Sequence, residues 1–170
     1  MKFEIDVSGC DIFDENYIIC IAKDNGEIIK GFKFKKELIN SLITNWKANK
    51  YKYNYDSHET KKGVFKVRIY SIVVYYLFKS AGKIDWLSLT ICKDFKGHIN
   101  EINQTLRFLL EKLNIKMGNP LHQSLPSTSY AHIYAGMMRR DKKNMLNTYV
   151  NITLEDIEKF LIKKVTPKGR

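Results

Sequence analysis

The stretch KFEIDVS, residues 2–8, alternates between apolar and polar side chains, a pattern that predicts a β-strand. Its apolar residues fall on one side of the strand, and Glu4, Asp6 and Ser8 fall on the other. An aspartate in the middle of a strand opposes the usual preferences of strand residues. This first strand therefore bears on both the fold and the location of a functional site.

Two more strands are expected directly after the first. Residues 17–23 (YIICIAK) are β-branched and apolar, and residues 27–34 (EIIKGFKF) form a second such run. Asn25-Gly26 lies between them, and this pair is typical of two-residue hairpin turns, where both positions need a positive φ. We expect the three strands to form an antiparallel meander.

The rest of the chain alternates helical and extended patterns. Residues 84–93 (IDWLSLTICK) are almost continuously apolar, which is typical of a central strand covered on both faces. Apolar spacing and capping signals predict helices over residues 35–48, 62–81, 98–113, 126–144 and 153–164, with at most a short strand within 115–125.

This order of elements predicts an α/β fold with one mixed β-sheet flanked by helices. The sheet combines the antiparallel three-stranded meander with parallel strands joined by crossover helices. The length favours a single domain over residues 1–164, followed by a basic tail at 165–170.

The chain carries a large excess of positive charge. Of its 170 residues, 29 are Lys or Arg and 18 are Asp or Glu, which gives a net charge of +11. Because each neutralised phosphate releases counterions, this excess favours DNA or RNA as a partner. The alternative is a lysine-rich surface that serves only solubility.

The cysteines and the hydropathy indicate a cytoplasmic, reducing location. Cys10, Cys20 and Cys92 form an odd number without C-x-x-C spacing, which argues against a disulfide framework or a zinc site. No signal-peptide pattern opens the sequence, and the longest apolar run, residues 69–78, is too short to span a bilayer. We expect no membrane partner.

Two aspartates are the main candidates for a metal site. Asp94 ends the predicted strand 84–93, and ligands bind at the carboxyl ends of strands in open α/β sheets. If this strand lies beside the first, Asp6 and Asp94 converge, and a cation such as Mg²⁺ or Mn²⁺ would relieve their repulsion. Such ions activate water for phosphodiester hydrolysis. The alternatives are a helix cap for Asp94 and local hydrogen bonds for Asp6.

Other residues could complete this site. His132 could be a third metal ligand or a proton shuttle, since imidazole binds divalent metals and titrates near neutrality. The alternative is a histidine at the surface or at the edge of the core. Glu59 and Asp141 are candidates for a fourth ligand. Glu59 could instead be an acid favoured at a helix start, and Asp141 a solvated charge.

Three stretches resemble the C-terminal RNase H-like nuclease domain of the bacterial excision-repair incision protein UvrC, a relative of endonuclease V. Asp6-Val7-Ser8 is similar to its Asp-x-Ser strand, and residues 93–100 (KDFKGHIN) to its second aspartate and the following helix start. Ala131-His132-Ile133-Tyr134-Ala135, followed by Arg139-Arg140, is similar to its histidine helix. The resemblance implies an RNase H-like fold and metal-dependent incision by Asp6, Asp94 and His132.

A lysine, a basic run and a set of tyrosines could contact nucleic acid. Lys96, at a predicted helix start, could bind a phosphate, and a basic run could follow the backbone or simply be a solvated helix face. Tyr51, Tyr53 and Tyr55 alternate with polar residues and could stack on bases or pack on the core. The basic run consists of Arg139, Arg140, Lys142 and Lys143.

The sequence thus predicts a metal-dependent endonuclease that uses Mg²⁺ or Mn²⁺ and acts on DNA or RNA. It could work as a homodimer or within a larger nucleoprotein complex. One alternative is a non-catalytic nucleic-acid-binding module or accessory subunit on the same fold. Another is a small-molecule or protein-interaction domain whose charge is incidental.

Overall fold

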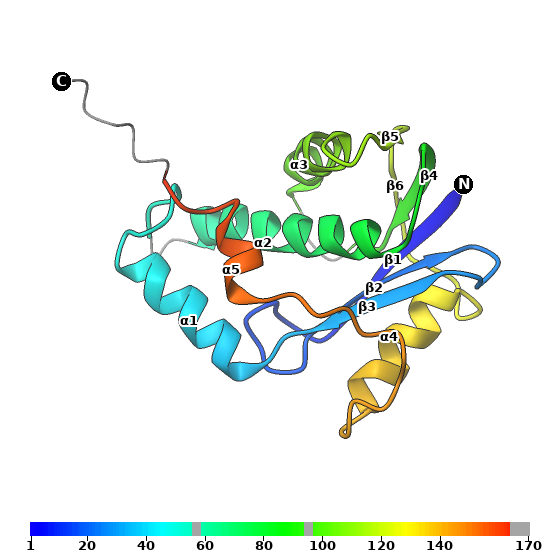
Figure 1. Ribbon diagram of the computed structural model, residues 1–170, viewed down its shortest axis with the longest axis horizontal. Coiled ribbons are helices and arrows are strands. Elements are labelled where there is room, and N and C mark those ends of the chain that lie inside the picture. Colours follow the sequence, from blue (N-terminus) through cyan, green and yellow to red (C-terminus); the bar gives the residue numbers. More distant parts are fainter. Residues whose placement is uncertain (56–58, 94–96, 164–170) are drawn as a thin grey trace.

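A computed structural model describes residues 1–55, 59–93 and 97–163, except the side chains of residues 59–61. It contains one sheet and its flanking helices (Figure 1). The elements are β1 (Lys2–Ser8), β2 (Ile18–Lys23), β3 (Ile29–Lys33), α1 (Lys36–Lys47), α2 (Glu59–Ser80), β4 (Trp86–Ile91), α3 (Ile99–Glu111), β5 (Lys116–Met117), β6 (Leu121–His122), α4 (Tyr130–Arg140) and α5 (Leu154–Glu158).

The sheet is mixed, as the sequence predicts. Its order is β3-β2-β1-β4-β5, and β6 also pairs with β4. The first three strands form the antiparallel meander, whereas β4 runs parallel to β1, β5 and β6. Parallel pairing places the carboxyl ends of β1 and β4 at the same edge of the sheet.

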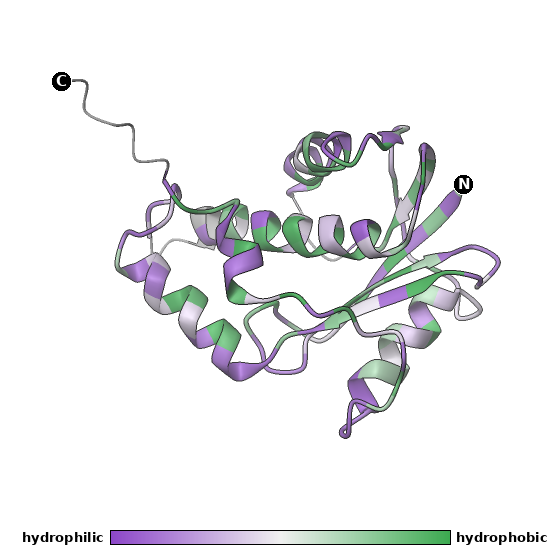
Figure 2. Cartoon of the chain, in the orientation of Figure 1, coloured by the Kyte–Doolittle hydropathy of each residue, from purple (hydrophilic) through white to green (hydrophobic). Residues whose placement is uncertain are grey.

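The main hydrophobic core lies between the sheet and the layer formed by α2 and α3 (Figures 1 and 2). Phe3 and Ile5 of β1 point into this core, and the Phe3 ring meets Phe78 of α2 edge-on at 5.2 Å. The helix α2 is apolar around most of its circumference because it is buried between the sheet and other helices. Among the described ranges, no helix is both long and apolar enough to cross a bilayer.

A smaller core lies on the opposite face, where α4 packs against β1, β2 and β3. It consists of Ile18, Cys20, Ala135 and Met138. The end of the Met138 side chain occupies the space that a Cβ atom at Gly31 of β3 would need. The glycine therefore allows α4 to approach the sheet closely.

The β2–β3 turn differs from the prediction. Lys23 N donates to Ile28 O at 2.8 Å, so the loop has four residues, 24–27, instead of two. Gly26 has a φ of 77°, but Asn25 does not have a positive φ. Its side-chain oxygen instead accepts a hydrogen bond from Glu27 N, at 3.1 Å. This side-chain contact stabilises the longer turn.

The structure differs from the sequence predictions in the end of α4, in the length of α5 and in the burial of β4. The helix α4 ends at Arg140, where the chain turns at Asp141. The helix α5 is only about one turn long, although a capping box between Thr153 and Asp156 confirms the capping signal at its start. The strand β4 is not covered on both faces, since Trp86 is 52% exposed. Each error concerns tertiary packing, which overrides local pattern at these points.

Replacing Gly31 by Ala should destabilise the protein by about 1–3 kcal/mol, because Met138 is fully buried and has little room to move. Urea unfolding measures this loss. Gly136→Ala, at a half-buried position of α4 where a Cβ atom would meet only Arg140, is the matched control and should be neutral or stabilising by up to about 1 kcal/mol. Equal stability of Gly31→Ala and wild type would contradict the close packing of α4.

Candidate functional site

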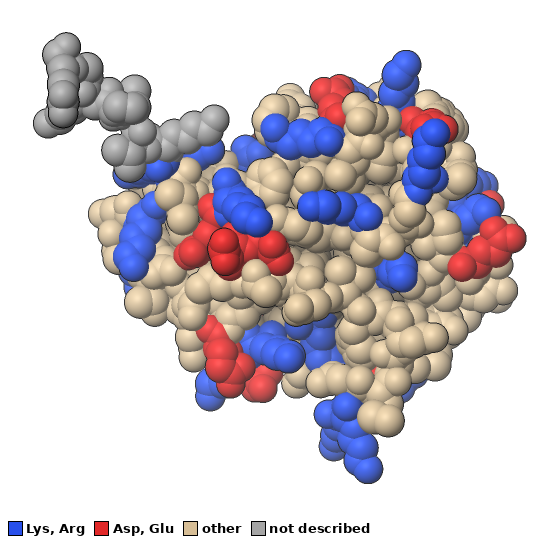
Figure 3. All heavy atoms as spheres, in the orientation of Figure 1, with Lys and Arg blue, Asp and Glu red and all other residues tan. Residues whose placement is uncertain are grey.

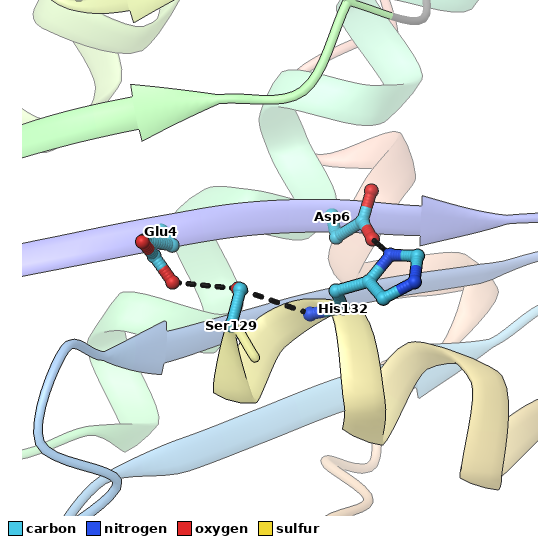
Figure 4. A network of polar contacts seen from close by, with 4 residues as sticks. All are labelled: Glu4, Asp6, Ser129 and His132. Atoms are coloured by element: carbon cyan, nitrogen blue, oxygen red, sulfur yellow. Dashed lines mark hydrogen bonds and ion pairs between the residues drawn. The ribbon is translucent and has the colours of Figure 1, made fainter. Parts of the chain in front are cut away.

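Asp6 and His132 form a hydrogen-bonded pair on the sheet face that α4 covers (Figure 4). Asp6 lies in the middle of β1 and is 3% exposed, and His132 lies in the first turn of α4. Their Oδ2 and Nδ1 atoms are 2.8 Å apart, although the residues are 126 positions apart in the chain. Since a carboxylate can only accept, Nδ1–H is the donor. The His132 side chain is 54% exposed, and its other ring nitrogen, Nε2, is not used in the contact with Asp6.

Glu4 and Ser129 support this pair (Figure 4). Ser129 caps α4: its hydroxyl accepts a hydrogen bond from His132 N at 3.3 Å and donates one to Glu4 Oε2 at 2.6 Å. Glu4 lies on the same side of β1 as Asp6, as the alternation predicts. Sequence reasoning assigned no role to either residue, although a serine before a helix is a recognisable capping signal.

The structure brings the strand that leads to Asp94 next to Asp6. Ile5 of β1 is the register partner of Ile91 of β4, and Cys92 N donates to Ile5 O at 3.0 Å. The condition under which Asp6 and Asp94 were expected to converge, that their strands are neighbours, is therefore met. Asp94 itself, like Lys96, lies outside the described residues. Within the described part of the chain, no three His, Cys, Asp or Glu side chains are grouped closely enough to hold a metal.

Cys20 is the register partner of Asp6 on β2 and is fully buried. Burial, and secondarily the Asp6 carboxylate, strongly raise the pKa of its thiol. Cys20 therefore stays protonated at neutral pH, and only a thiolate is an effective nucleophile or metal ligand.

The two candidates for a fourth ligand lie elsewhere. Glu59 begins α2, and its side chain is outside the described part. Asp141 lies at the opposite end of α4, about 13 Å from His132 along the helix axis. Its Oδ2 accepts hydrogen bonds from Leu146 N at 3.0 Å and Tyr149 Oη at 2.9 Å. The structure therefore does not bring Asp141 to the Asp6–His132 pair.

Asp141 instead anchors the loop that follows α4. The Leu146 amide, with smaller contributions from Met145, Tyr149 and Lys33, lowers the pKa of its carboxyl. Lys33 of β3 is 8% exposed and donates to Asp141 O at 2.7 Å and to Asn144 Oδ1 at 2.8 Å. Burial lowers the pKa of this lysine, an effect that the Asp141 charge opposes. These contacts fix the loop to the sheet.

The predicted basic run lies on the surface. Arg139 and Arg140 end α4, Lys142 and Lys143 follow, and all four are exposed. Within the described residues, none of them has a carboxylate at ion-pair distance. A Cβ atom at Gly9 would lie 3.3 Å from Arg139 Nη1, so this guanidinium reaches the loop that follows β1. Figure 3 shows basic side chains at the tip below α4.

Of the three tyrosines of residues 51–55, Tyr51 and Tyr53 pack on the core, whereas Tyr55 is 38% exposed. Tyr51 is fully buried, stacks with Phe65 and donates to Glu158 Oε1 at 2.6 Å. Tyr53 also contacts Phe65, and Tyr55 contacts Trp46 edge-on at 4.9 Å. Of the two alternatives that the sequence left open, packing on the core therefore holds for Tyr51 and Tyr53.

Comparisons with protein-family models, with curated proteins and with solved structures found no match. Fold and site thus define the class directly. This is an α/β protein with an open mixed sheet, flanked by helices, that carries a hydrogen-bonded Asp–His pair between its central strand and α4.

Ser129→Ala should lower the free energy of unfolding by about 1–2 kcal/mol, because α4 loses its cap and Glu4 loses its hydroxyl donor. Urea unfolding measures the change. Ser127→Ala removes an exposed hydroxyl from the same segment and should have almost no effect. If both variants unfold alike, the Glu4–Ser129 contact does not hold the start of α4.

Asp141→Asn tests whether this residue is a loop anchor. Its lowered pKa means that the carboxylate stabilises the fold above about pH 4, and that this stability is lost as the pH falls through the folded-state pKa. The variant should be less stable than wild type at pH 7 and should approach it at low pH. Urea midpoints between about pH 2 and pH 7 measure this. A constant difference across that range would contradict the anchoring role.

Proposed function

We propose that this protein is a metal-dependent endonuclease that hydrolyses phosphodiester bonds of DNA or RNA on an RNase H-like fold. The observation that carries the proposal is the 2.8 Å contact between the buried Asp6 carboxylate and His132. Burying a carboxylate is costly unless it is hydrogen-bonded, so its place on a central strand favours a functional role. The mixed sheet, with β4 beside β1, is compatible with the fold that the sequence resemblance implies.

Asp6 and His132 can act together in proton transfer. The carboxylate holds the proton of His132 on Nδ1 and so leaves Nε2 as the basic atom. The imidazole is more than half exposed, so a water molecule or a substrate oxygen can reach Nε2. His132 would accept a proton from the attacking water, while Asp6 orients the ring and stabilises its charged form.

The donor atoms of the pair also fit a divalent cation. Carboxylate oxygen suits Mg²⁺ and Mn²⁺, and imidazole nitrogen suits the transition metals. Asp6 and Asp94 would hold the ion. His132 would complete the ligand set through Nε2 as the alternative to its role as base, because a metal-bound Nε2 cannot accept a proton. A bound Mg²⁺ or Mn²⁺ supplies an activated water and neutralises charge on the phosphate.

The basic run would bind the nucleic-acid backbone. Arg139 reaches the loop after β1, on the carboxyl side of Asp6. A guanidinium there can hold a phosphate with two parallel hydrogen bonds, next to the proposed site of hydrolysis. The net charge of +11 favours the same partner. A homodimer or a larger nucleoprotein complex would be compatible with this surface.

Cleavage assays test the proposal. Wild type should cleave at least one of single-stranded, double-stranded, branched or hybrid substrates when Mn²⁺ is present. Asp6→Asn and His132→Ala should each lower the rate by about 100-fold or more, since they remove the general base or its orientation. Asp14→Asn, an exposed aspartate in the loop after β1, is the matched control and should cleave normally.

The other outcomes distinguish the nuclease from the two alternative functions. Salt-sensitive binding by wild type without cleavage in any metal would replace the enzyme with a non-catalytic binding module. Unimpaired cleavage by Asp6→Asn would refute the assigned site. Absence of nucleic-acid binding would favour a small-molecule or protein-interaction domain.

A further inference from the structure

The helix α4 packs on β1, β2 and β3, so β4, β5 and β6 lie beyond it on the sheet face that carries Asp6 (Figure 1). Trp86 of β4 is the register partner of Lys116 of β5, and Ser88 of β4 is the partner of Lys2 of β1. Register partners point to the same face, and alternation puts Trp86 and Ser88 on one side of β4. Lys2, Trp86, Ser88 and Lys116 therefore form one surface, here called the Trp86 surface.

The indole of Trp86 is unusually open. Its side chain is 52% exposed, whereas Trp46 is 2% exposed and stacks on Phe65 inside the core. A Cβ atom at Gly118 would lie 3.5 Å from Trp86 Cζ2, in ordinary contact, so part of the ring rests near this glycine. The rest of the ring faces solvent, where it offers a flat apolar surface.

The charges around this indole favour a polyanion. Lys2 and Lys116 are both exposed on the same face. The acids that adjoin the surface are Asp85, at 4.0 Å from Lys83, and Asp24, whose backbone amide donates to Lys2 O. Glu4, two residues from Lys2 on the same face, is a third acid and accepts a hydrogen bond from Ser129. Within the described residues, neither Lys2 nor Lys116 has a carboxylate at ion-pair distance, in a chain whose net charge is +11.

A single unpaired base fits this surface better than a protein partner does. Leu121, 58% exposed, is the register partner of Thr90 on the same face, four residues along β4 from Trp86, which is about 13 Å. The two exposed apolar side chains are therefore separated, and among the described residues of these strands no other exposed apolar side chain joins them on this face. Protein interfaces need such a patch, whereas one ring flanked by ammonium groups suffices to stack a base and hold its phosphates.

We propose that the Trp86 surface binds single-stranded DNA or RNA, with one unpaired base stacked on Trp86 and the adjoining phosphates at Lys2 and Lys116. The inference rests on the nucleic-acid partner of the proposed function, but it does not require cleavage. Trp86 lies about 20 Å from Asp6 along the parallel strands, so this is a second contact for the strand, outside the proposed site of hydrolysis. Paired bases do not expose their faces, so a blunt duplex should not use it.

Tryptophan fluorescence provides the test, with a short oligo(dT) titrated into the full chain in EDTA. The tryptophan fluorescence of wild type should be quenched when the oligonucleotide binds. Trp86→Phe should lose most of this quenching, because the remaining tryptophan, Trp46, is buried. Trp86→Ala should weaken binding about tenfold, the value of one stacked base. Phe108→Ala removes another exposed aromatic residue, on α3, and should bind normally. The logarithm of the binding constant falls linearly with the logarithm of the salt concentration, and Lys2→Gln or Lys116→Gln should each make this slope shallower by about 0.7.

Three results would overturn the inference: wild-type affinity of Trp86→Ala for oligo(dT), equal quenching by a blunt duplex, or a wild-type dimer in gel filtration that Trp86→Ala dissociates. The last would make the surface an interface between copies. Asp6→Asn distinguishes this inference from the nuclease proposal. Its tryptophan fluorescence should be quenched by oligo(dT) as strongly as that of wild type, although it should not cleave. Quenching without cleavage would refute only the nuclease, and cleavage without any effect of Trp86→Ala on binding would refute only the stacking site.

Discussion

The close packing of α4 on the meander is the constraint on which the candidate site depends. It requires Gly31 opposite Met138, small Ala135 in the contact, and the Ser129 cap tied to Glu4. Only when the helix lies this close can His132 reach a carboxylate on the central strand. The pair is thus held by packing and capping on both sides of the hydrogen bond, and its geometry does not depend on a flexible loop.

The burial of Asp6 gives this hydrogen bond its significance. A carboxylate taken out of water loses hydration that one neutral donor only partly replaces. A strand that needed only to pair and pack would carry an apolar or β-branched residue at this position. The chain instead keeps the acid beside the carboxyl end of β4 and aligns an exposed imidazole with it, which is an arrangement suited to chemistry more than to stability.

Other charged groups of the same face serve the structure. Lys33 and Asp141 are engaged with the loop after α4, which they attach to β3. Arg139 and Arg140, at the end of the same helix, are exposed. The two tryptophans differ in the same way, since Trp46 stacks inside the core whereas Trp86 is exposed to solvent.

The sequence by itself determined the elements and the side of β1 on which Asp6 lies, because alternation, helical spacing and capping are local properties of the chain. The Thr153 capping box and the antiparallel meander followed from such patterns. Only the tertiary structure decided that α4 covers the Asp6 side, that Tyr51 turns inward and that Trp86 stays open. These outcomes join residues far apart in the chain, and they depend on how whole layers pack, which no short window of sequence encodes.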